Sequence, residues 1–294
     1  MPELPDITVY IERLETLIVR QPLAMLDIRN PFVLRSVTPT PTDLAGRQVV
    51  GIRRMGKRIV IGFEGDVFAV IHLMIAGRLR WRPPGKKGPG RIALAAFLFP
   101  TGTLFLTEAG STRRASIFLV AGEQGLAEFA RGGLEVFESS AEEFAARLMS
   151  ENHTLKRALT DPRLFSGIGN AYSDEILHRA RLSPLMLTSK LDPGQITVLR
   201  DATIATLREW TDRLRARAGD GFPEEVTAFH EEMAVHGRFG LPCPVCGSPV
   251  QRIRYATNET NYCARCQTGG RLLADRALSR LLKQDWPRSI DEVD

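Results

Sequence analysis

The sequence predicts a multidomain α+β protein: an N-terminal helix with an antiparallel β-sandwich, a helical second domain, and a C-terminal cysteine-rich β-hairpin. Short β-rich runs separated by turns fill residues 49–120, whereas apolar residues recur at helical spacing beyond residue 140. The 294-residue length also favours more than one domain. We expect the divisions at 1–132, 133–237 and 238–294.

The first element is an amphipathic helix. Apolar side chains recur at positions 7, 10, 11, 14, 17 and 18, and Asp6 is placed to cap the first amides. Removal of Met1 would leave Pro2 with a free secondary amine beside the carboxylate of Glu3. A free α-amino group has a pKa near ~8, against about 10.4 for lysine, so part of it is an unprotonated nucleophile at neutral pH. The opening stretch is therefore either a nucleophilic site or only a helix entrance.

The following elements are predicted from apolar periodicity and turn residues. Strands are expected at 58–63, 67–73, 92–99 and 104–107, where β-rich runs are bounded by Gly, Pro and Asp. Closely spaced strands of this kind favour an antiparallel sandwich or barrel. Helices are expected at 141–149, 154–159, 170–180, 196–217 and 224–235.

Positive charge is concentrated in two zones. The formal net charge is +5 and the isoelectric point is about 9.2. Residues 67–107 contain no acid but six basic residues, and residues 250–284 contain seven basic residues against two acids. Clustered Lys and Arg are typical of proteins that bind a polyanion, although a basic soluble surface is the simpler explanation. The longest apolar runs are too short to span a bilayer, so we expect a cytoplasmic protein. We also expect it to be a monomer.

Four cysteines form two C-x-x-C pairs near the C-terminal end. Cys243 and Cys246 make the first pair, and Cys263 and Cys266 the second, with 16 residues between the pairs. This spacing predicts one tetrahedral Zn²⁺ site of four thiolates. Such a site has no open coordination position, so the zinc is expected to be structural. The residues between the pairs alternate like two strands around a turn.

The stretch LFSGIGNAYSDEIL, residues 164–177, places two glycines in a turn and Asn170 where a helix begins. Glycines permit close approach of the backbone to a phosphate, and a helix N-terminus presents free amides with partial positive charge. The alternative is a helix–helix turn without a ligand.

Together these features resemble the Fpg/Nei family of DNA glycosylase/AP lyases. The resemblance covers nearly the whole chain: PELPD at the start, RRMGKR, HLMIAGRL, GIGNAYSDEIL and the final CPVC…YCARCQ. It implies the fold outlined above, with a helix-two-turn-helix (H2TH) middle domain, one structural zinc ion, and double-stranded DNA with a damaged base or abasic site as the partner. It also implies association with the nucleoid through DNA.

The resemblance also implies roles for individual residues. Pro2 matches the nucleophile, Glu3 the adjacent acid/base and Lys57 the catalytic lysine of the β-domain. The residues that match DNA contacts are Met74, Arg114, Lys156, Asn170 and Asn258. Met74 corresponds to the side chain that fills the gap left by a flipped base. Without the resemblance, Lys57 would be interpreted as a solvated lysine in a strand turn. For Met74, a core methionine after a strand is the alternative.

Two stretches depart from the family pattern. Asn258 stands where the zinc finger usually carries an arginine, so the positive charge and the bidentate geometry are lost. STRRAS, residues 111–116, replaces the usual DPRRFG, so Ala115 stands where an aromatic residue follows Arg114. These changes make a second, δ-elimination step doubtful and leave the preferred lesion and opposite base open.

Two other functions remain possible from the sequence. A protein of the same fold that binds damaged or bent DNA without cutting it would account for Asn258 and Ala115. An RNA-binding zinc protein of the translation apparatus is the third hypothesis, which the sequence at the N-terminus disfavours.

Overall fold

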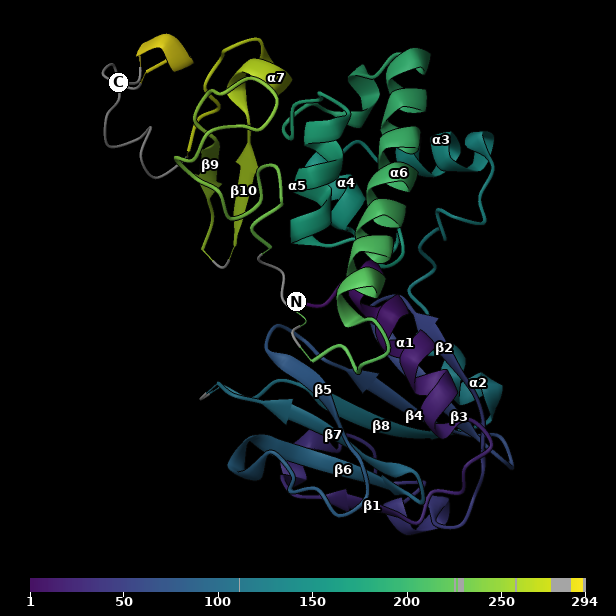
Figure 1. Ribbon diagram of the computed structural model, residues 1–294. Coiled ribbons are helices and arrows are strands. Elements are labelled where there is room, and N and C mark those ends of the chain that lie inside the picture. The colour runs from purple at the N-terminus through teal and green to yellow at the C-terminus, as the bar shows by residue number, and fades with distance from the viewer. Residues whose placement is uncertain (111, 225, 227–229, 257, 276–286, 293–294) are drawn as a thin grey trace. The chain divides into compact units, whose positions relative to one another are not determined.

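The computed structural model describes the whole chain except residues 111, 225, 227–229, 257, 276–286 and 293–294. The chain forms two compact units, which are described separately (Figure 1). One contains residues 1–131 and 210–227, and the other contains residues 132–209 and 228–294. Within the described residues, no helix is both long enough and apolar enough to cross a membrane.

Two antiparallel four-stranded sheets build the first unit. Their strand orders are β1-β6-β7-β5 and β2-β3-β4-β8. The first sheet contains β1 (Met25–Ile28), β6 (Ala93–Phe99), β7 (Gly102–Glu108) and β5 (Gly77–Arg82). The second contains β2 (Val49–Met55), β3 (Arg58–Phe63), β4 (Val67–His72) and β8 (Ser116–Ala121). The predicted antiparallel sandwich is confirmed.

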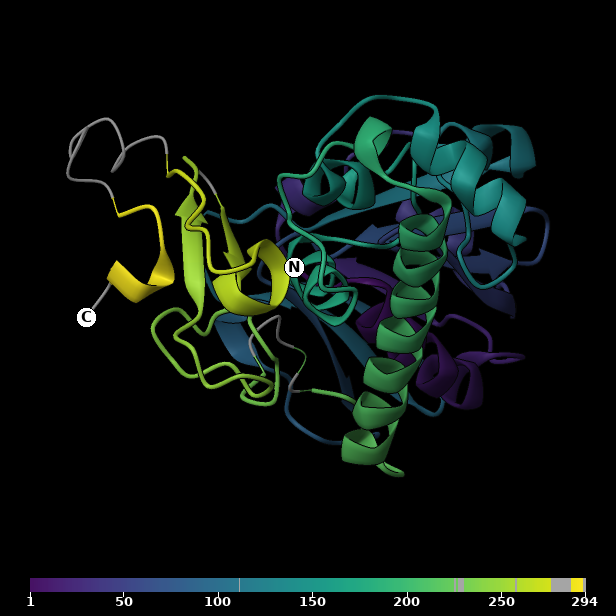
Figure 2. The same ribbon diagram turned by 90° about the horizontal axis from the view of Figure 1, so that it is seen from above.

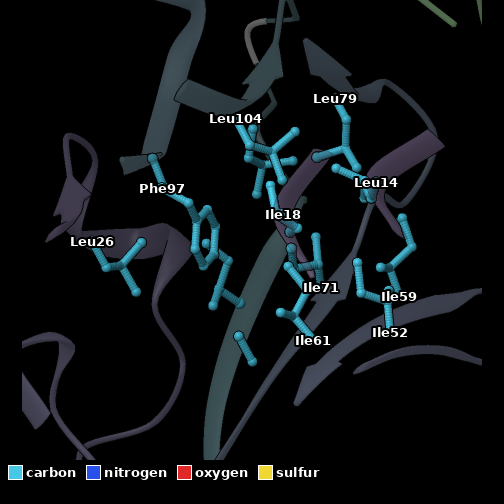
Figure 3. Packing of buried hydrophobic residues seen from close by; sticks show 14 of the residues in the cluster. Leu14, Ile18, Leu26, Ile52, Ile59, Ile61, Ile71, Leu79, Phe97 and Leu104 are labelled. Atoms are coloured by element: carbon cyan, nitrogen blue, oxygen red, sulfur yellow. The ribbon is translucent and has the colours of Figure 1, made fainter. Parts of the chain in front are cut away.

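The core of the first unit lies where helix α1 (Leu4–Ile18) and the two sheets meet. Alternate residues of each strand point inward, as the period of two requires. Figure 3 shows Ile18 of α1 between Ile71 of one sheet and Leu104 of the other, and Leu14 of the same helix next to Leu79. On the opposite face of β4, Phe68 and Val70 pack against Leu126 of α2 (Gly122–Ala127). Three short 3-10 helices complete the unit: η1 (Pro31–Val33), η2 (Pro41–Leu44) and η3 (Gly90–Ile92).

Helices dominate the first half of the second unit. They are α3 (Ala141–Met149), α4 (Leu155–Thr160), α5 (Asn170–Arg179), the 3-10 helix η4 (Thr188–Lys190) and the start of α6 (Pro193–Ala218), whose end belongs to the first unit. Gly167, with φ +79°, forms the turn before α5, and Gly169 is the N-cap residue. The expected glycine turn followed by a helix is confirmed.

The expected helix at 224–235 is wrong for the residues that the structure describes there. Residues 224, 226 and 230–235 are not helical. Val226 packs into the core of the first unit, whereas Val235 packs beside Cys243 in the second. The apolar residues of this segment serve two different cores, so they do not form one helical face.

The C-terminal part of the second unit is a two-stranded hairpin. Strands β9 (Gln251–Arg254) and β10 (Glu259–Tyr262) pair antiparallel, as the alternation predicts, and lie side by side in Figures 1 and 2. Helix α7 (Ala264–Thr268) and the 3-10 helix η6 (Ile290–Glu292) follow. A small cluster that includes Ile253, Tyr262 and Ile290 is its only apolar support among the described residues outside the cysteine cluster. Three basic residues of the second charged zone, at 276, 280 and 283, lie outside the described residues.

Candidate active site and nucleic-acid interface

Helix α1 holds the N-terminus inside the first unit. The helix begins at Leu4, two residues before the expected cap, and Glu3 is its N-cap residue. Asp6 therefore lies within the first turn, where its Oδ2 accepts a hydrogen bond from the backbone N–H of Glu3 at 2.8 Å. The Glu3 side chain accepts from the Asp6 backbone in return, forming a capping box. Pro2 is buried, and Glu3 is only 2% exposed.

Charged side chains of several elements surround the N-terminal amine. Burial lowers the pKa of the Met1 amine; the carboxylate of Glu3 opposes this shift, and nearby Arg78 adds to it. Asp6 and Lys57 act on the same amine more weakly, in opposite directions. The structure therefore brings the charge of Lys57, which lies in the turn between β2 and β3, close to the N-terminus. Lowering the pKa of an amine raises the fraction that can act as a nucleophile.

Arg78 and His72 belong to this site, although sequence reasoning did not single them out. The Nη1 group of Arg78 donates to the backbone oxygens of Ile75 at 3.1 Å and Gly77 at 2.7 Å. Burial, together with Arg58 and Lys57, lowers the pKa of His72 to about 4, so its ring is neutral at pH 7. The HLMIAGRL motif contains both residues, and the six cations at 67–107 were the available signal for Arg78.

Asp6 is a buried carboxylic acid whose second oxygen has no hydrogen-bond partner among the described residues. Burial raises its pKa from 3.8 to about 7, while the hydrogen bond from Glu3 acts in the opposite direction. The folded chain holds the Asp6 proton more tightly than the unfolded chain does. The free energy of folding that this proton contributes is therefore fully present below about pH 4 and is lost as the pH rises through about 7.

Asp6→Asn is expected to remove this pH dependence. Relative to the variant, the wild type should lose up to about 4 kcal/mol of unfolding free energy between pH 4 and pH 8. Denaturant unfolding at a series of pH values measures the difference, and Asp220→Asn, at an exposed position, is the matched control. A constant difference between wild type and Asp6→Asn across this range would contradict the assignment.

The turn between β4 and β5 presents apolar side chains at the surface. Met74 is half-buried with φ +53°, a left-handed conformation that is costly for a methionine. Ile75, the next residue, is 57% exposed. A Cβ atom on Gly77 would lie 2.2 Å from the Leu73 oxygen, so only glycine fits this tight turn. Met74 is therefore not a core methionine.

The loop between β7 and β8 carries Arg114. The buried carboxylate of Glu108 accepts hydrogen bonds from the backbone N–H groups of Arg114 at 2.8 Å and Ala115 at 2.9 Å. The Arg114 side chain is exposed, whereas Ala115 is 3% exposed and belongs to the core. Ala115 thus presents no side chain for insertion into a duplex. Sequence reasoning missed Glu108, because its role depends on a loop six residues away.

In the second unit, Lys156 and Asn170 meet at the start of α5. The Nζ group of Lys156 donates to Asp174 Oδ1 at 2.5 Å and to the Asn170 backbone oxygen at 2.6 Å. The other Asp174 oxygen, Oδ2, contacts His236 Nδ1 at 2.8 Å. The Asn170 side chain donates to the backbone oxygen of Glu259 in β10 at 2.9 Å. The two predicted residues are therefore held together, and Lys156 is an ion-paired, 9% exposed group.

Lys156→Met is expected to destabilise the protein by about 3–5 kcal/mol, because the buried Asp174 carboxylate loses its ammonium partner. Adding Asp174→Asn in the same chain should restore part of the loss. Chemical denaturation measures both changes, with the exposed Lys190→Met as the control, expected within about 0.5 kcal/mol of wild type. Equal stability of Lys156→Met and Lys190→Met would show that the ion pair contributes nothing.

Asn258 lies in the turn between β9 and β10. It is exposed, and its backbone oxygen accepts from the Tyr255 N–H at 2.8 Å. The hairpin tip therefore presents an uncharged amide at the surface. The hairpin contains Arg252, whose guanidinium lies 4.1 Å from the centre of the Phe239 ring.

The four cysteines converge on one point in the second unit. Their Sγ atoms all lie within 4.8 Å of one another, with 3.9 Å between Cys243 and Cys266 and 3.4 Å between Cys246 and Cys263. A tetrahedral zinc with ~2.3 Å bonds requires sulfur separations near ~3.8 Å, so the group fits Zn²⁺. The site is closed by four sulfur ligands, and His178 Nε2 lies 3.3 Å from Cys243 Sγ, which suits a hydrogen bond that orients a thiolate.

Comparison with known proteins identifies the family. Three family models match: "Formamidopyrimidine-DNA glycosylase N-terminal domain" at residues 1–109, "Formamidopyrimidine-DNA glycosylase H2TH domain" at 134–214 and "Zinc finger found in FPG and IleRS" at 240–269. A formamidopyrimidine-DNA glycosylase of Thermus thermophilus is 33% identical over 284 residues, covering 92% of this chain and 100% of the relative. The chain belongs to the formamidopyrimidine-DNA glycosylase family.

Other members of the formamidopyrimidine-DNA glycosylase family are similar to this chain in structure or in sequence. The crystal structure of MutM (FPG) from Thermus thermophilus has a TM-score of 0.76 at 30% identity and covers 90% of this chain and 98% of that one. A Lactococcus lactis FPG variant bound to Fapy-dG-containing DNA has a TM-score of 0.80 at 25% identity and covers 91% and 100%. An uncharacterized formamidopyrimidine-DNA glycosylase-like protein of Mycobacterium tuberculosis is 41% identical over 151 residues, covering 51% of this chain and 94% of that protein. The predicted family, fold class and single structural zinc ion are confirmed.

Proposed function

We propose that this chain is a base-excision-repair DNA glycosylase with AP lyase activity, acting on oxidised or ring-opened bases in double-stranded DNA. Membership of the formamidopyrimidine-DNA glycosylase family supports this function. The single observation that carries it is the buried Pro2 with the buried carboxylate of Glu3 beside it, next to the Met1 amine on which the charges of Lys57 and Arg78 act. In this arrangement an amine can act as the nucleophile, Glu3 can transfer protons, and the two cations can bind phosphate.

In the proposed mechanism, Met1 is removed and Pro2 carries the free secondary amine. The amine nitrogen attacks C1′ of the damaged nucleotide, a C1′–N bond forms, and the bond to the base breaks with its electron pair leaving on the base. The nitrogen then loses its proton and the C1′–O4′ bond breaks, with its electron pair on the ring oxygen, so that an iminium forms at C1′. This iminium makes the C2′ proton acidic, and loss of that proton expels the 3′-phosphate and completes β-elimination. Glu3 carries the required protons, including the one delivered to the sugar ring oxygen.

The other residues of the first unit bind and open the duplex. Lys57 meets phosphate charge beside the nucleophile. The target nucleotide must leave the base stack before its sugar is accessible, which costs a few kcal/mol. Met74, at the exposed turn before Gly77, fills the gap and offsets part of this cost. The backbone of Arg114 is held by its hydrogen bond to Glu108, and the Arg114 side chain contacts the base opposite the lesion, which has lost its pairing partner.

The second unit binds the phosphate backbone of the same DNA. The N-terminus of α5, with Asn170 and the firmly held Lys156, binds phosphate without reading sequence. Asn258 at the hairpin tip supplies hydrogen bonds without the positive charge of an arginine. The proposed reaction therefore stops after β-elimination and does not include δ-elimination. We assign residues 1–132 to the catalytic domain, 133–237 to the H2TH domain and 238–294 to the finger and tail. The protein is proposed to act as a monomer in the cytoplasm, associated with the nucleoid through DNA.

A panel of lesion duplexes tests this function. Mass spectrometry first establishes that Met1 is absent, and each duplex is then incubated with the zinc-loaded protein. Excision with a β-elimination end from at least one oxidised or ring-opened base is the expected result. Binding without excision on every duplex would favour the non-cleaving DNA-binding alternative, and the panel also identifies the preferred lesion and opposite base.

A further inference from the structure

The chain continues past the zinc site and folds back onto the hairpin. Residues 270–275 and 287–292 follow the part of the chain that the family models match, which ends at residue 269. An antiparallel bridge between Arg271 and Ser289 joins these two stretches, so they lie side by side. We call the two stretches together the C-terminal segment.

Apolar side chains hold the C-terminal segment on the hairpin. One buried cluster joins three side chains of the segment to Ile253 of β9 and Tyr262 of β10. The three side chains are those of Leu272, Leu273 and Ile290. The backbone N–H of Leu273 also donates a hydrogen bond to the Tyr262 hydroxyl at 2.8 Å. The segment is therefore packed against both strands, because its apolar surface is removed from water there.

Asp275 extends this contact to the end of β9. It is 1% exposed, and its Oδ2 accepts a hydrogen bond from the backbone N–H of Arg254 at 2.6 Å. The next N–H, that of Tyr255, donates across the turn to the Asn258 oxygen at 2.8 Å. Successive N–H groups of a strand point in opposite directions, so the N–H of Arg254 points away from β10. The Asp275 carboxylate supplies its acceptor, and a carboxylate makes a stronger hydrogen bond than a neutral oxygen does.

We infer that the C-terminal segment is a positioning element for DNA binding, in which Asp275 holds the hairpin tip in the conformation that contacts the DNA backbone. Residues 255–258 of the tip, Asn258 among them, carry no charged side chain. A hydrogen bond weakens steeply when its angle is poor, whereas attraction between charges falls off gradually with distance. The affinity for DNA therefore depends on how firmly this uncharged tip is held. The inference rests on the proposed function, because it takes DNA as the partner.

Binding of a fluorescent duplex with a tetrahydrofuran abasic analogue to the zinc-loaded protein tests the inference. Asp275→Ala is expected to raise Kd about tenfold and to speed hydrogen exchange of the Arg254 amide by a similar factor, because one charge-assisted hydrogen bond is lost. Asp275→Asn keeps an acceptor oxygen and should restore most of both values. Glu138→Ala removes an acid from an exposed position in the same unit and should change neither. Zinc content, and the rate of borohydride-trapped adduct formation at saturating abasic DNA, should stay as in wild type.

The outcomes separate positioning from a purely structural role and from a simple charge effect. Faster exchange of the Arg254 amide with an unchanged Kd would overturn the inference, because Asp275 would then only stabilise the hairpin. Tighter binding by both Asp275 variants would also overturn it, since that is the effect of removing a negative charge near DNA.

A second variant decides the question if Asp275→Ala does not retain zinc. Tyr262→Phe removes the hydroxyl that accepts from Leu273 and keeps the ring in the apolar cluster. A Kd raised about fivefold supports the inference, and a Kd equal to that of wild type overturns it. If the wild type binds the duplex yet excises no base from any lesion, the proposed function fails while the Kd values still decide the positioning role.

Discussion

Glu3→Gln is expected to lower base excision by about 10²–10⁴-fold while leaving reaction with a ready-made abasic site largely intact. The amide can neither accept nor deliver a proton, and departure of the base depends on that transfer. An abasic site already exposes the sugar aldehyde, so the Pro2 amine condenses with it without expelling a base. The measurement compares single-turnover excision of a lesion with the borohydride-trapped adduct on abasic DNA.

Blocking the amine is expected to abolish both reactions, because the proposed mechanism uses the Pro2 nitrogen to displace the base and to condense with an abasic site. A chain with an uncleaved Gly-Ser extension before Pro2 has its nitrogen in an amide, so no covalent adduct with abasic DNA should be trapped. The matched control is the same protein after protease removal of the extension, which restores the free amine. An adduct that forms with the extension in place would exclude Pro2 as the nucleophile and direct attention to Lys57.

Much of the architecture could be predicted from the sequence because it depends on local patterns. Strand alternation in β3 and β4, the glycine turn before α5 and the cysteine spacing each specify structure within a short window. The segment at 224–235 failed for the same reason. Its apolar spacing is helical, but Val226 and Val235 belong to different cores, and no local pattern contains that information.

The supporting residues of the site were hidden because their partners are distant or unusual. In the sequence, Asp174 is indistinguishable from an ordinary polar helix residue. In the structure it pairs with Lys156, 18 positions earlier, and contacts His236, 62 positions later. Asp6 was expected to cap α1 from outside, whereas it lies in the first turn and is buried beside the N-terminal amine. Burial of a carboxylic acid cannot be inferred from residue type, since aspartate is usually exposed.

Loss of the zinc ligand at Cys246 is expected to unfold the hairpin and weaken DNA binding by about 100-fold. Structural zinc contributes on the order of 10 kcal/mol to small metal-bound domains, and the apolar cluster around Tyr262 and Ile253 is too small to replace it. Strand β9 carries Arg252 and Arg254, and loss of one charge-assisted phosphate contact from each, at about 1.5 kcal/mol, corresponds to ~100-fold in Kd. Cys246→Ser tests this, with zinc content, hydrogen exchange and Kd as readouts.

Cys246→His is the matched control, since Cys246 is exposed and an imidazole nitrogen can complete a Cys₃His site. It should retain zinc, protected amides in β9 and β10, and most of the DNA affinity. In Cys246→Ser, the amides of β3 and β4 should stay protected, because the core of the sandwich contains no cysteine. Full zinc content and unchanged affinity in Cys246→Ser would show that three thiolates suffice. Loss of protection in β3 as well would show that zinc supports the whole fold and not the hairpin alone.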